Sequence, residues 1–512
     1  MSEATLWCFA DQLGPHFADD PAQDVLLVES TALFSRRVYH RRKAHLILSA
    51  LRHRAAADPA RVRLIKAATY REALAELAPT AQRPLQVRDP TSYAARRFVR
   101  RLAAGELGIA SDAVVILPER GFAATPAEFQ QWAASRGSRR VLMEDFYRGQ
   151  RRRHRLLLEP DGEPTGGTWN LDHDNREPPP AGASVLGAAV DLPEPWWPEE
   201  DEIDAGVRAD LDAMASAGVT FVGDDGPRRF AVTRDEALAA LAHFVGGRLR
   251  HFGPYEDAML AADRWMAHSL LSVPLNLGLL DPVEVAREAE TAYRAGLVPL
   301  PSAEGFVRQV VGWRDYVWHM YWHGGEDYRQ RNALEMTEPL PDWFADLDAD
   351  GRVQARCLSD VLRTVREEGW AHHIPRLMVL SNWASQRGYD PAAVTDWFHT
   401  RFVDGYEWVM TANVIGMSMH ADGGMLATKP YVSGGAYIDR MSDYCGGCRY
   451  DPKVRVGETA CPFTAGYWSY LDRHAEELRG NPRMSRAVAG LARLRDREAT
   501  VSQEADRGSD PP

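Results

Sequence analysis

The spacing of the cysteines constrains this chain most. Of its five cysteines, three fall within the stretch SDYCGGCRYDPKVRVGETACPF and one lies upstream in the same C-terminal third. A Cys-x-x-Cys pair lets two thiolates bind one metal centre across a tight turn, which Gly446 and Gly447 favour. Four thiolates suit a structural zinc ion or a [4Fe–4S] cluster; they are those of Cys357, Cys445, Cys448 and Cys461. Because Cys-x-x-Cys alone is a moderate signal, buried thiols without a metal are the alternative.

Length and composition indicate two or more globular domains. The chain has 512 residues, of which 45% are hydrophobic and 26% charged, enough for buried cores. It has no apolar run of about 18 residues, as a membrane helix requires, and its first residues, MSEATLWCFADQLG, do not resemble a signal peptide. Few cysteines, grouped as ligands, fit a reducing compartment better than a disulfide framework. We therefore expect a cytoplasmic protein that does not enter a membrane.

The net charge of −12 argues against a general nucleic-acid coat. A local basic face is still compatible with this charge, because affinity for phosphate depends on nearby lysines and arginines. Solvated helix faces balanced by acids are the alternative for each basic cluster. The clusters are Arg36, Arg37, Arg41, Arg42 and Lys43; Arg96, Arg97, Arg100 and Arg101; and Arg148, Arg151, Arg152, Arg153 and Arg155.

Residues 1–145 are expected to form an α/β domain with a Rossmann-like parallel sheet. Apolar runs predict its strands, and the apolar spacing of residues 41–53 predicts a helix between them. No G-x-G-x-x-G follows the first strand, so a dinucleotide site of that kind is not supported. The expected strands are residues 4–10, 24–29, 61–67, 113–117 and 140–143.

The rest of the chain is predicted to be a connector followed by an all-α domain. Residues 146–230 are rich in Pro, Gly and Asp and indicate a long surface connector. The sequence of residues 231–475 is mostly typical of helices. It has a capping box at Thr233-x-x-Glu236 and a helix start at Asp281-Pro282. Residues 476–512 are expected to form a C-terminal helix and a polar, disordered tail from about residue 497.

Three segments of the helical region contain candidate functional residues. Ser269 and Ser272 lie near a helix start, where hydroxyls and backbone N–H groups suit a diphosphate. In a second segment, Arg308, Gln309, Trp313 and Arg314 have helical spacing. His372 and His373 are adjacent, so on a helix only one of them faces a given pocket squarely. Cap, core and structural roles are the alternatives.

These segments together resemble a known family. HSLLSVPLN followed by DPVEV, FVRQVVGWRDYV and AHHIPRLM resemble the flavin-binding helical domain of the photolyase/cryptochrome family. KPYVSGGAYIDRMSDYCGGCRYDP…ACPF resembles the iron–sulfur bacterial cryptochromes and photolyases of that family, as do DQLGP and YHRRKAHLILSALRH near the N-terminus. The resemblance extends from about residue 4 to residue 475.

The resemblance implies two chromophores. The α/β domain would hold an antenna, 6,7-dimethyl-8-ribityllumazine, and the helical domain would hold FAD. Ser269, Leu270 and Ser272 would lie along the FAD phosphates, with Arg308 and Trp313 nearby. Asp404 matches the acid that hydrogen-bonds the flavin ring. The remaining residues expected at FAD are Met410 and Asn413.

The resemblance also implies a cluster, a reaction and an electron path. It favours a [4Fe–4S] cluster over zinc on the four cysteines. His373, with His372 beside it, matches the histidine that repair of (6–4) photoproducts requires, and Tyr431 and Tyr437 match residues near the lesion. Trp397 and Tyr406 match aromatic residues of electron transfer to the flavin. The expected partner is UV-damaged DNA, bound by a monomer.

Two departures from the family pattern keep alternatives open. Met410 occupies the position expected to face flavin N5, where a thioether cannot exchange a proton. The segment DWFADLDADGRVQARC lacks the family's Trp-Thr-Gly-like stretch, and Trp343 lies too far upstream to match it. The leading interpretation is a blue-light-driven (6–4) photolyase. The alternatives are a photoreceptor of the same fold that does not repair DNA, and a zinc-containing nucleic-acid binder without flavin.

Overall fold

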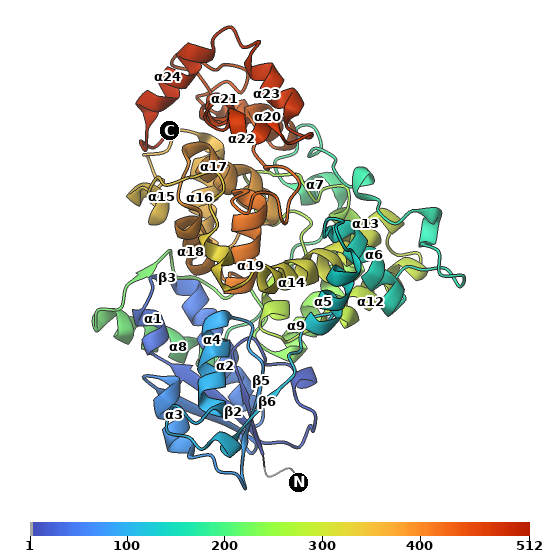
Figure 1. Cartoon of the computed structure of the whole chain (residues 1–512), viewed down its shortest axis with the longest axis vertical. Helices are drawn as coiled ribbons and strands as arrows, with labels where there is room; N and C mark the ends of the chain where they lie inside the picture. The colour runs from blue at the N-terminus through green and yellow to red at the C-terminus, as the bar shows by residue number, and fades with distance from the viewer. Residues whose placement is uncertain (1–3) are drawn as a thin grey trace.

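The computed structural model describes residues 4–512. It consists of an N-terminal parallel sheet with its helices, followed by a largely helical region (Figure 1), so the predicted fold class is confirmed. The five strands are ordered β4-β2-β1-β5-β6, and every neighbouring pair is parallel. They are β1 (Thr5–Cys8), β2 (Val25–Ser30), β4 (Val62–Ala67), β5 (Leu85–Arg88) and β6 (Val114–Leu117).

Alternation along the central strands buries both faces of the sheet. Trp7 and Leu26 pack into one apolar cluster, whereas Leu6 and Leu27 pack into another, because successive side chains of a strand point to opposite faces. The helices of this region are α1 (Ala32–Ser35), α2 (Arg41–Ala57), α3 (Tyr70–Leu77), α4 (Tyr93–Ala103) and α5 (Pro126–Ser135).

Two details of the sheet differ from the sequence prediction. The strand expected at residues 140–143 is wrong, because α6 (Met143–His154) begins there. Glu144 and Asp145 in its first turn favour a helix start through the helix dipole. Strand β5 was not predicted, because only half of its four residues are apolar and the signal is correspondingly weak.

The segment between the sheet and the helical region contains helices that pack on both parts. Helix α6 packs against the helical region, and α8 packs against α2. A two-residue strand of this segment, β7, pairs in parallel with β3, a two-residue strand of the N-terminal region. The elements are β3 (Tyr39–His40), α7 (Leu186–Val190), α8 (Glu202–Ser216) and β7 (Phe221–Val222), with 3-10 turns η3 (Thr165–Gly167) and η4 (Asp172–Asp174).

The helical region begins at the predicted capping box. Thr233 Oγ1 accepts from the backbone N–H of Glu236, whose side chain bonds back to Thr233 N–H, and Asp281 caps the helix that starts at Pro282. None of the helices in residues 4–512 has both the length and the apolar character needed to cross a membrane. The first helices are α9 (Arg234–His243), α10 (Leu249–Phe252), α11 (Ser272–Asn276), α12 (Pro282–Arg294), α13 (Leu300–Val307) and α14 (Asp315–His323).

Four π-helical segments interrupt this region, a feature that apolar periodicity does not predict. They are η5 (Phe244–Arg248), η6 (Arg308–Arg314), η8 (Pro375–Ser381) and η9 (Ala412–Ser418). Such segments are frequent at functional sites. The other helices are α15 (Asp342–Ala345), α16 (Arg356–Glu368), α17 (Asn382–Arg387), α18 (Pro391–Arg401), α19 (Glu407–Thr411), α20 (Gly435–Met441), α21 (Pro462–Arg473), α22 (Ala475–Arg479), α23 (Ser485–Leu491) and α24 (Arg497–Arg507).

The disordered tail predicted from about residue 497 is wrong. Helix α24 occupies this segment, packs against α21 and lies with the other red helices at the end of the molecule opposite the sheet (Figure 1). Glu504 is buried and forms an ion pair with the buried Arg387 of α17. The polar composition was misleading because this polar helix is held by a buried ion pair that local sequence does not reveal.

We predict that Glu504→Gln destabilises the C-terminal part of the molecule. Removing one partner of a buried ion pair costs about 3–5 kcal/mol, because the other charge stays buried without compensation. Thermal unfolding followed by circular dichroism should show a lower midpoint for Glu504→Gln. The exposed Glu498→Gln in the same helix should leave the midpoint unchanged. Equal midpoints for both variants would contradict the assignment.

Candidate functional site

A buried carboxylate, Asp404, joins three separate segments. Arg376 in η8 donates two hydrogen bonds to it, at 2.9 Å and 3.0 Å. Ser272 Oγ donates to the same carboxylate at 2.8 Å, and Asn276 Nδ2 donates to the Asp404 carbonyl at 3.1 Å. The structure thus brings the predicted residues Ser272 and Asp404 together. Sequence reasoning missed Arg376 and Asn276, although both lie within the motifs that carried the resemblance.

Lys43 links the α/β domain to this carboxylate's loop. It comes from α2, is buried, and donates to the His399 carbonyl at 2.5 Å and to the Gly405 carbonyl. Burial lowers the pKa of Lys43 to about 7, while nearby Asp404 acts in the opposite direction. Since both acceptors belong to the helical region, the position of the loop depends on the domain interface.

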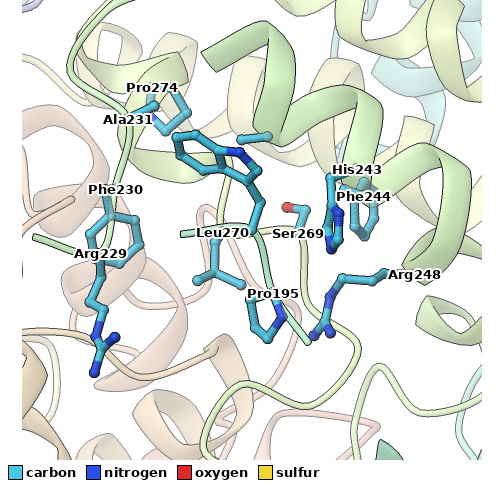
Figure 2. A pocket seen from close by; sticks show the side chains of 12 residues that line it. Pro195, Arg229, Phe230, Ala231, His243, Phe244, Arg248, Ser269, Leu270 and Pro274 are labelled. Atoms are coloured by element: carbon cyan, nitrogen blue, oxygen red, sulfur yellow. The ribbon is translucent and has the colours of Figure 1, made fainter. Parts of the chain in front are cut away.

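A pocket opens beside the predicted residues Ser269 and Leu270 (Figure 2). Cationic or polar side chains from other segments line it, including Arg229, His243 and Arg248. Nε of Arg248 is buried without a hydrogen-bond partner among the described residues, whereas Nε of Arg229 forms an ion pair with Glu368 at 3.5 Å. Apolar and aromatic walls with cationic side chains suit a diphosphate joined to ring systems. The apolar lining is Pro195, Trp196, Phe230, Ala231, Ala240, Phe244 and Pro274.

Arg308 and Trp313 lie apart from this pocket. Neither is among the 12 described residues that line it. Arg308 is buried in ion pairs with Asp172 at 2.8 Å and Glu304 at 3.3 Å. Burial would lower the pKa of Arg308, but the surrounding carboxylates outweigh this effect and raise the pKa. Trp313 is half-buried and packs against Tyr316.

The other residues predicted at the flavin or on an electron path lie in the same helical core. Met410 is buried at the end of α19, and Asn413 is half-buried in η9. Trp397 packs against Phe344, with ring centroids 4.8 Å apart, and its Nε1 donates to the Phe344 carbonyl at 3.2 Å. Tyr406 precedes α19, and burial raises the pKa of its hydroxyl.

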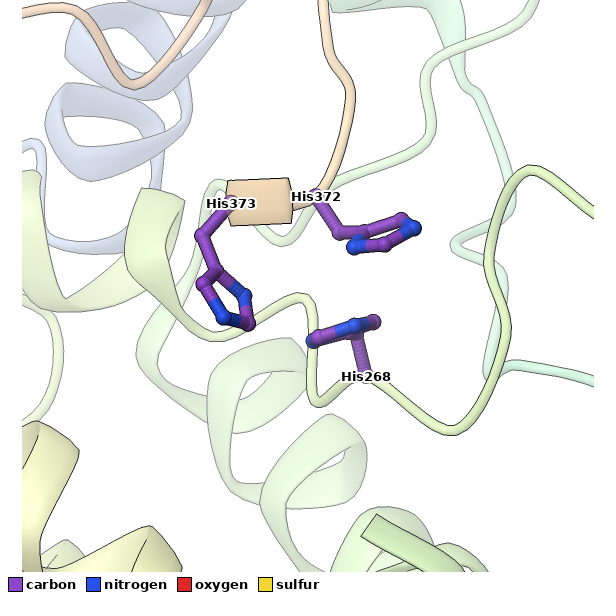
Figure 3. A group of neighbouring side chains, drawn as sticks. All are labelled: His268, His372 and His373. Atoms are coloured by element: carbon purple, nitrogen blue, oxygen red, sulfur yellow. The ribbon is translucent and has the colours of Figure 1, made fainter. Parts of the chain in front are cut away.

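Three histidine rings form a compact group (Figure 3). His268 stacks on His372 with ring centroids 4.3 Å apart, and His373 lies 5.4 Å from His268. His372 directly precedes the helix and His373 starts it, so the helical separation expected for the pair does not apply. Burial lowers the pKa of His268 and of His372. His268 was missed because no sequence signal distinguishes it from a structural histidine.

Asp257 connects His373 to one of the predicted tyrosines. Its carboxylate lies 3.4 Å from His373 Nε2 and accepts from Tyr437 Oη at 3.5 Å. Burial raises the pKa of Tyr437, and Asp257 reinforces this shift. Tyr431 is also largely shielded from solvent, and the Lys429 ammonium lies 6.0 Å from its ring centroid. Three of the four residues predicted to be catalytic therefore meet around His268 and Asp257.

Glu256, the neighbour of Asp257, is a second acid at this site. It is buried, and Gln309 Nε2 donates to its Oε1 at 2.6 Å. Burial raises the pKa of Glu256 to about 7, against the opposing effect of Arg308. A carboxyl group with this pKa changes protonation near neutral pH. Sequence reasoning missed both acids because they lie in a loop without a recognised motif.

All four predicted ligand cysteines line one cavity. Cys357 belongs to α16, Cys445 and Cys448 to the turn η10 (Cys445–Gly447) and its end, and Cys461 precedes α21. Apolar side chains complete the wall, including those of Ala355, Ile438 and Phe463. Burial raises the pKa of Cys357, and the three other thiols act in the same direction.

The separation of these sulfur atoms is informative about the group that they suit. Among the described residues, no three of them lie within 4.8 Å of one another. Four thiolates on one zinc ion would be about 3.8 Å apart at the usual Zn–S distance. A Cβ on Gly435 would lie 2.8 Å from Cys461 Sγ, so glycine keeps the cavity open. The donor set and the shared cavity therefore fit a metal centre held by the four thiols together.

Several arginines of the basic clusters are occupied by acids. Arg41 pairs with Asp212 and Asp225, Arg42 with Glu368, Arg96 with Asp89, Arg97 with Glu326, and Arg153 with Glu128. This pairing supports the alternative of balanced helix faces for these members. Other cations lie near Tyr431 and Tyr437, where they act on the pKa of these tyrosines; they are Arg176, Arg440 and Arg483.

Comparison with known proteins gives one relative along nearly the whole chain. The chain is 39% identical over 514 residues to the (6-4) photolyase of Agrobacterium fabrum, covering 96% of each sequence. A family model described as deoxyribodipyrimidine photo-lyase-related protein matches residues 6–220. Two solved structures share the fold at low identity. A bacterial class III photolyase from Agrobacterium tumefaciens has a TM-score of 0.55 and 14% identity, with 93% of this chain and 98% of that chain covered.

The second structure is the cryptochrome of Synechocystis sp. PCC6803, with a TM-score of 0.53 and 12% identity, over 86% of this chain and 88% of that chain. At these sequence identities the two structures support the fold alone. The relative that matches along its full length carries the assignment. The chain therefore belongs to the photolyase/cryptochrome family.

Proposed function

We propose that this protein repairs (6–4) photoproducts in DNA with blue light and FAD. The observation that carries the proposal is the group formed by His373, Asp257 and Tyr437, in a chain whose full-length relative is named a (6-4) photolyase. His373 is accessible, with 46% of its side chain exposed. A DNA base turned out of the helix can therefore reach this imidazole.

Two sets of residues would hold FAD. Ser269, Leu270, Arg229 and Arg248 line the pocket of Figure 2 and suit the diphosphate. The Arg376–Asp404 pair lies beside Ser272 and would orient the polar edge of the ring system. When bound and reduced, FAD supplies an electron to the lesion after absorbing light. The pair would hold its hydrogen-bonding groups in place, because Asp404 is buried and four hydrogen bonds fix it.

His373 would donate a proton to the lesion. Asp257 would orient its ring through Nε2, and the exposed part of the ring would meet the substrate. A protonated imidazole is a suitable general acid near neutral pH. Tyr437 shares Asp257 as a partner, and its hydroxyl is thereby fixed at the same site. The buried His268 and His372 would shape the wall beneath it.

The damaged strand would be bound by cations around this opening. Arg176, Lys429, Arg440 and Arg483 lie near Tyr431 and Tyr437 and suit the phosphates on either side of the lesion. A damaged base costs less to unstack than an intact pair. The protein would act as a monomer in the cytoplasm. An antenna, 6,7-dimethyl-8-ribityllumazine, would occupy the α/β domain.

The four cysteines would hold a [4Fe–4S] cluster. The support is the shared cavity and its apolar lining. Cys357 and Cys461 come from segments far apart in the sequence, so the cluster would join α16 to the start of α21.

We predict that His373→Ala abolishes repair while FAD stays bound. The substrate is an oligonucleotide with one (6–4) lesion, illuminated with reduced protein, and a cyclobutane dimer is the parallel control. Loss of a general acid costs on the order of 100- to 10,000-fold in rate. The exposed His323→Ala should repair at the normal rate. If the intact protein with bound FAD repairs neither lesion, the photoreceptor alternative would replace this proposal. Met410 at the position expected to face flavin N5 favours that alternative.

Asp404→Asn is expected to lower the FAD content of the purified protein. The substitution leaves the largely buried Arg376 beside a neutral group and disrupts the hydrogen bonds that fix the loop. Flavin absorbance per protein gives the content. Asp396→Asn, which breaks half-exposed ion pairs with Arg37 and Arg329, is the control and should keep FAD. Equal FAD content in the two variants would separate Asp404 from cofactor binding.

Cys445→Ser should lose iron and acid-labile sulfide, because one thiolate ligand is replaced by a poor one. Cys8→Ser is the matched control, since Cys8 is buried in the α/β domain, where burial raises the pKa of its thiol to about 12. Iron content and absorbance near the cluster bands distinguish the two variants. Zinc in place of iron in the wild-type protein would overturn the cluster assignment.

A further inference from the structure

We propose that His268, His372 and His373 form a binding site for a divalent transition-metal ion, with Zn²⁺ as the probe. An ion bound there would block repair, because it would occupy a nitrogen of His373; this consequence rests on the proposed function. The binding site itself does not depend on the reaction. It lies between the loop before α11 and the start of η8.

The three rings already present their nitrogens to one another. One nitrogen from each ring lies within 4.8 Å of the other two. Figure 3 shows the His268 and His372 rings one above the other, each with a nitrogen turned toward His373. Ligand nitrogens on a tetrahedral zinc ion are about 3.3 Å apart at the usual Zn–N distance. The nitrogens therefore need to approach one another by at most about 1.5 Å, and rotation about the soft χ2 torsions of the rings would provide this movement.

Two of the nitrogens lack any partner that the protein itself supplies. His268 is 7% exposed and His372 is 4% exposed. Within residues 4–512, Nε2 of His268 and Nδ1 of His372 are buried without a hydrogen-bond partner. Buried polar atoms are normally paired, because an unpaired one costs about 1–3 kcal/mol. A metal ion would satisfy both atoms at once.

The third ring provides access and orientation. Because His373 is only half shielded, an ion can reach the buried pair from solvent. Its Nε2 lies 3.4 Å from Asp257 Oδ1. Metal-binding histidines commonly use their second nitrogen to contact a carboxylate, which fixes the tautomer and the ring. Asp257 would take this role when the other nitrogen of His373 binds the ion.

The donor set selects the kind of metal. Imidazole nitrogens suit zinc, copper and nickel, whereas magnesium and calcium prefer oxygen ligands. Three protein ligands leave a fourth position for water, a pattern of open rather than structural zinc sites. A metal-bound nitrogen has no free lone pair or proton, so His373 could not exchange a proton with a lesion.

A second candidate group serves as the comparison. His53, Asp201 and Asp204 also lie within 4.8 Å of one another. However, Asp201 caps α8 through the backbone N–H groups of Ile203 and Asp204, and Asp204 accepts from Arg228 at 3.1 Å. The carboxylate oxygens of this second group are therefore already used in hydrogen bonds, and we expect no ion to bind there.

The test measures zinc uptake by equilibrium dialysis and metal analysis, in the dark and without DNA. Wild-type protein with bound FAD is compared with His268→Gln, His372→Gln and His53→Gln. The four cysteines are a competing site, but every variant retains them. We expect the first two variants to bind one zinc ion fewer than the wild type, and His53→Gln to bind as many. A 100-fold excess of Mg²⁺ should not displace the zinc ion that the wild type binds and the first two variants do not. Asp257→Asn should weaken this site about 10- to 100-fold.

Equal uptake by wild type, His268→Gln and His372→Gln would overturn the site, as would loss of uptake in His53→Gln. Anomalous diffraction at the zinc edge from wild-type crystals avoids any folding defect of the variants. A peak among the three rings supports the site, and its absence there overturns it. Zinc binding without repair activity would count against the proposed function alone. Repair that bound zinc leaves unchanged would overturn the assignment of His373 as a ligand of the ion.

Discussion

The ion pair between Arg376 and Asp404 is the interaction on which the rest of the site depends. It is bidentate, its carboxylate is buried, and Ser272 donates to the same carboxylate, so two segments distant from each other in sequence are fixed to Asp404. Lys43 connects the α/β domain to this site, since it donates a hydrogen bond to the carbonyl of Gly405, the residue after Asp404. A bidentate arginine restricts both distance and orientation. The proposed flavin contacts, the domain interface and the start of the histidine segment therefore share one anchor.

Burial divides the polar groups of the site into two kinds. Asp404 is satisfied by protein donors, whereas within residues 4–512 His268, His372 and Arg248 each retain a buried nitrogen without a hydrogen-bond partner. Because such atoms are costly to leave unpaired, they indicate where a ligand belongs. The unpaired nitrogen of Arg248 belongs to a residue that lines the pocket proposed for the diphosphate. The unpaired histidine atoms belong to the rings of the proposed metal site. His373 differs by its exposure, which suits a group that meets substrate.

Local sequence predicted those features that depend on neighbours along the chain. The strands at residues 4–10, 24–29, 61–67 and 113–117 and the caps at Thr233 and Asp281 were predicted correctly, because apolar runs and capping are local. Helix α24 was missed because its stability comes from the distant Arg387. The strand expected at residues 140–143 failed because four apolar and basic residues fit either a strand or a helix start.

The sequence by itself determined the fold class, the family and the residue types of the site, including the four cysteines and the histidine pair. These follow from motifs, whose spacing is written in the chain. Only the tertiary structure decided that His268 stacks on His372, that Asp257 lies between His373 and Tyr437, and that Arg308 is held in ion pairs. Such contacts join segments far apart in sequence, and they arise from packing that buries each group beside a particular partner.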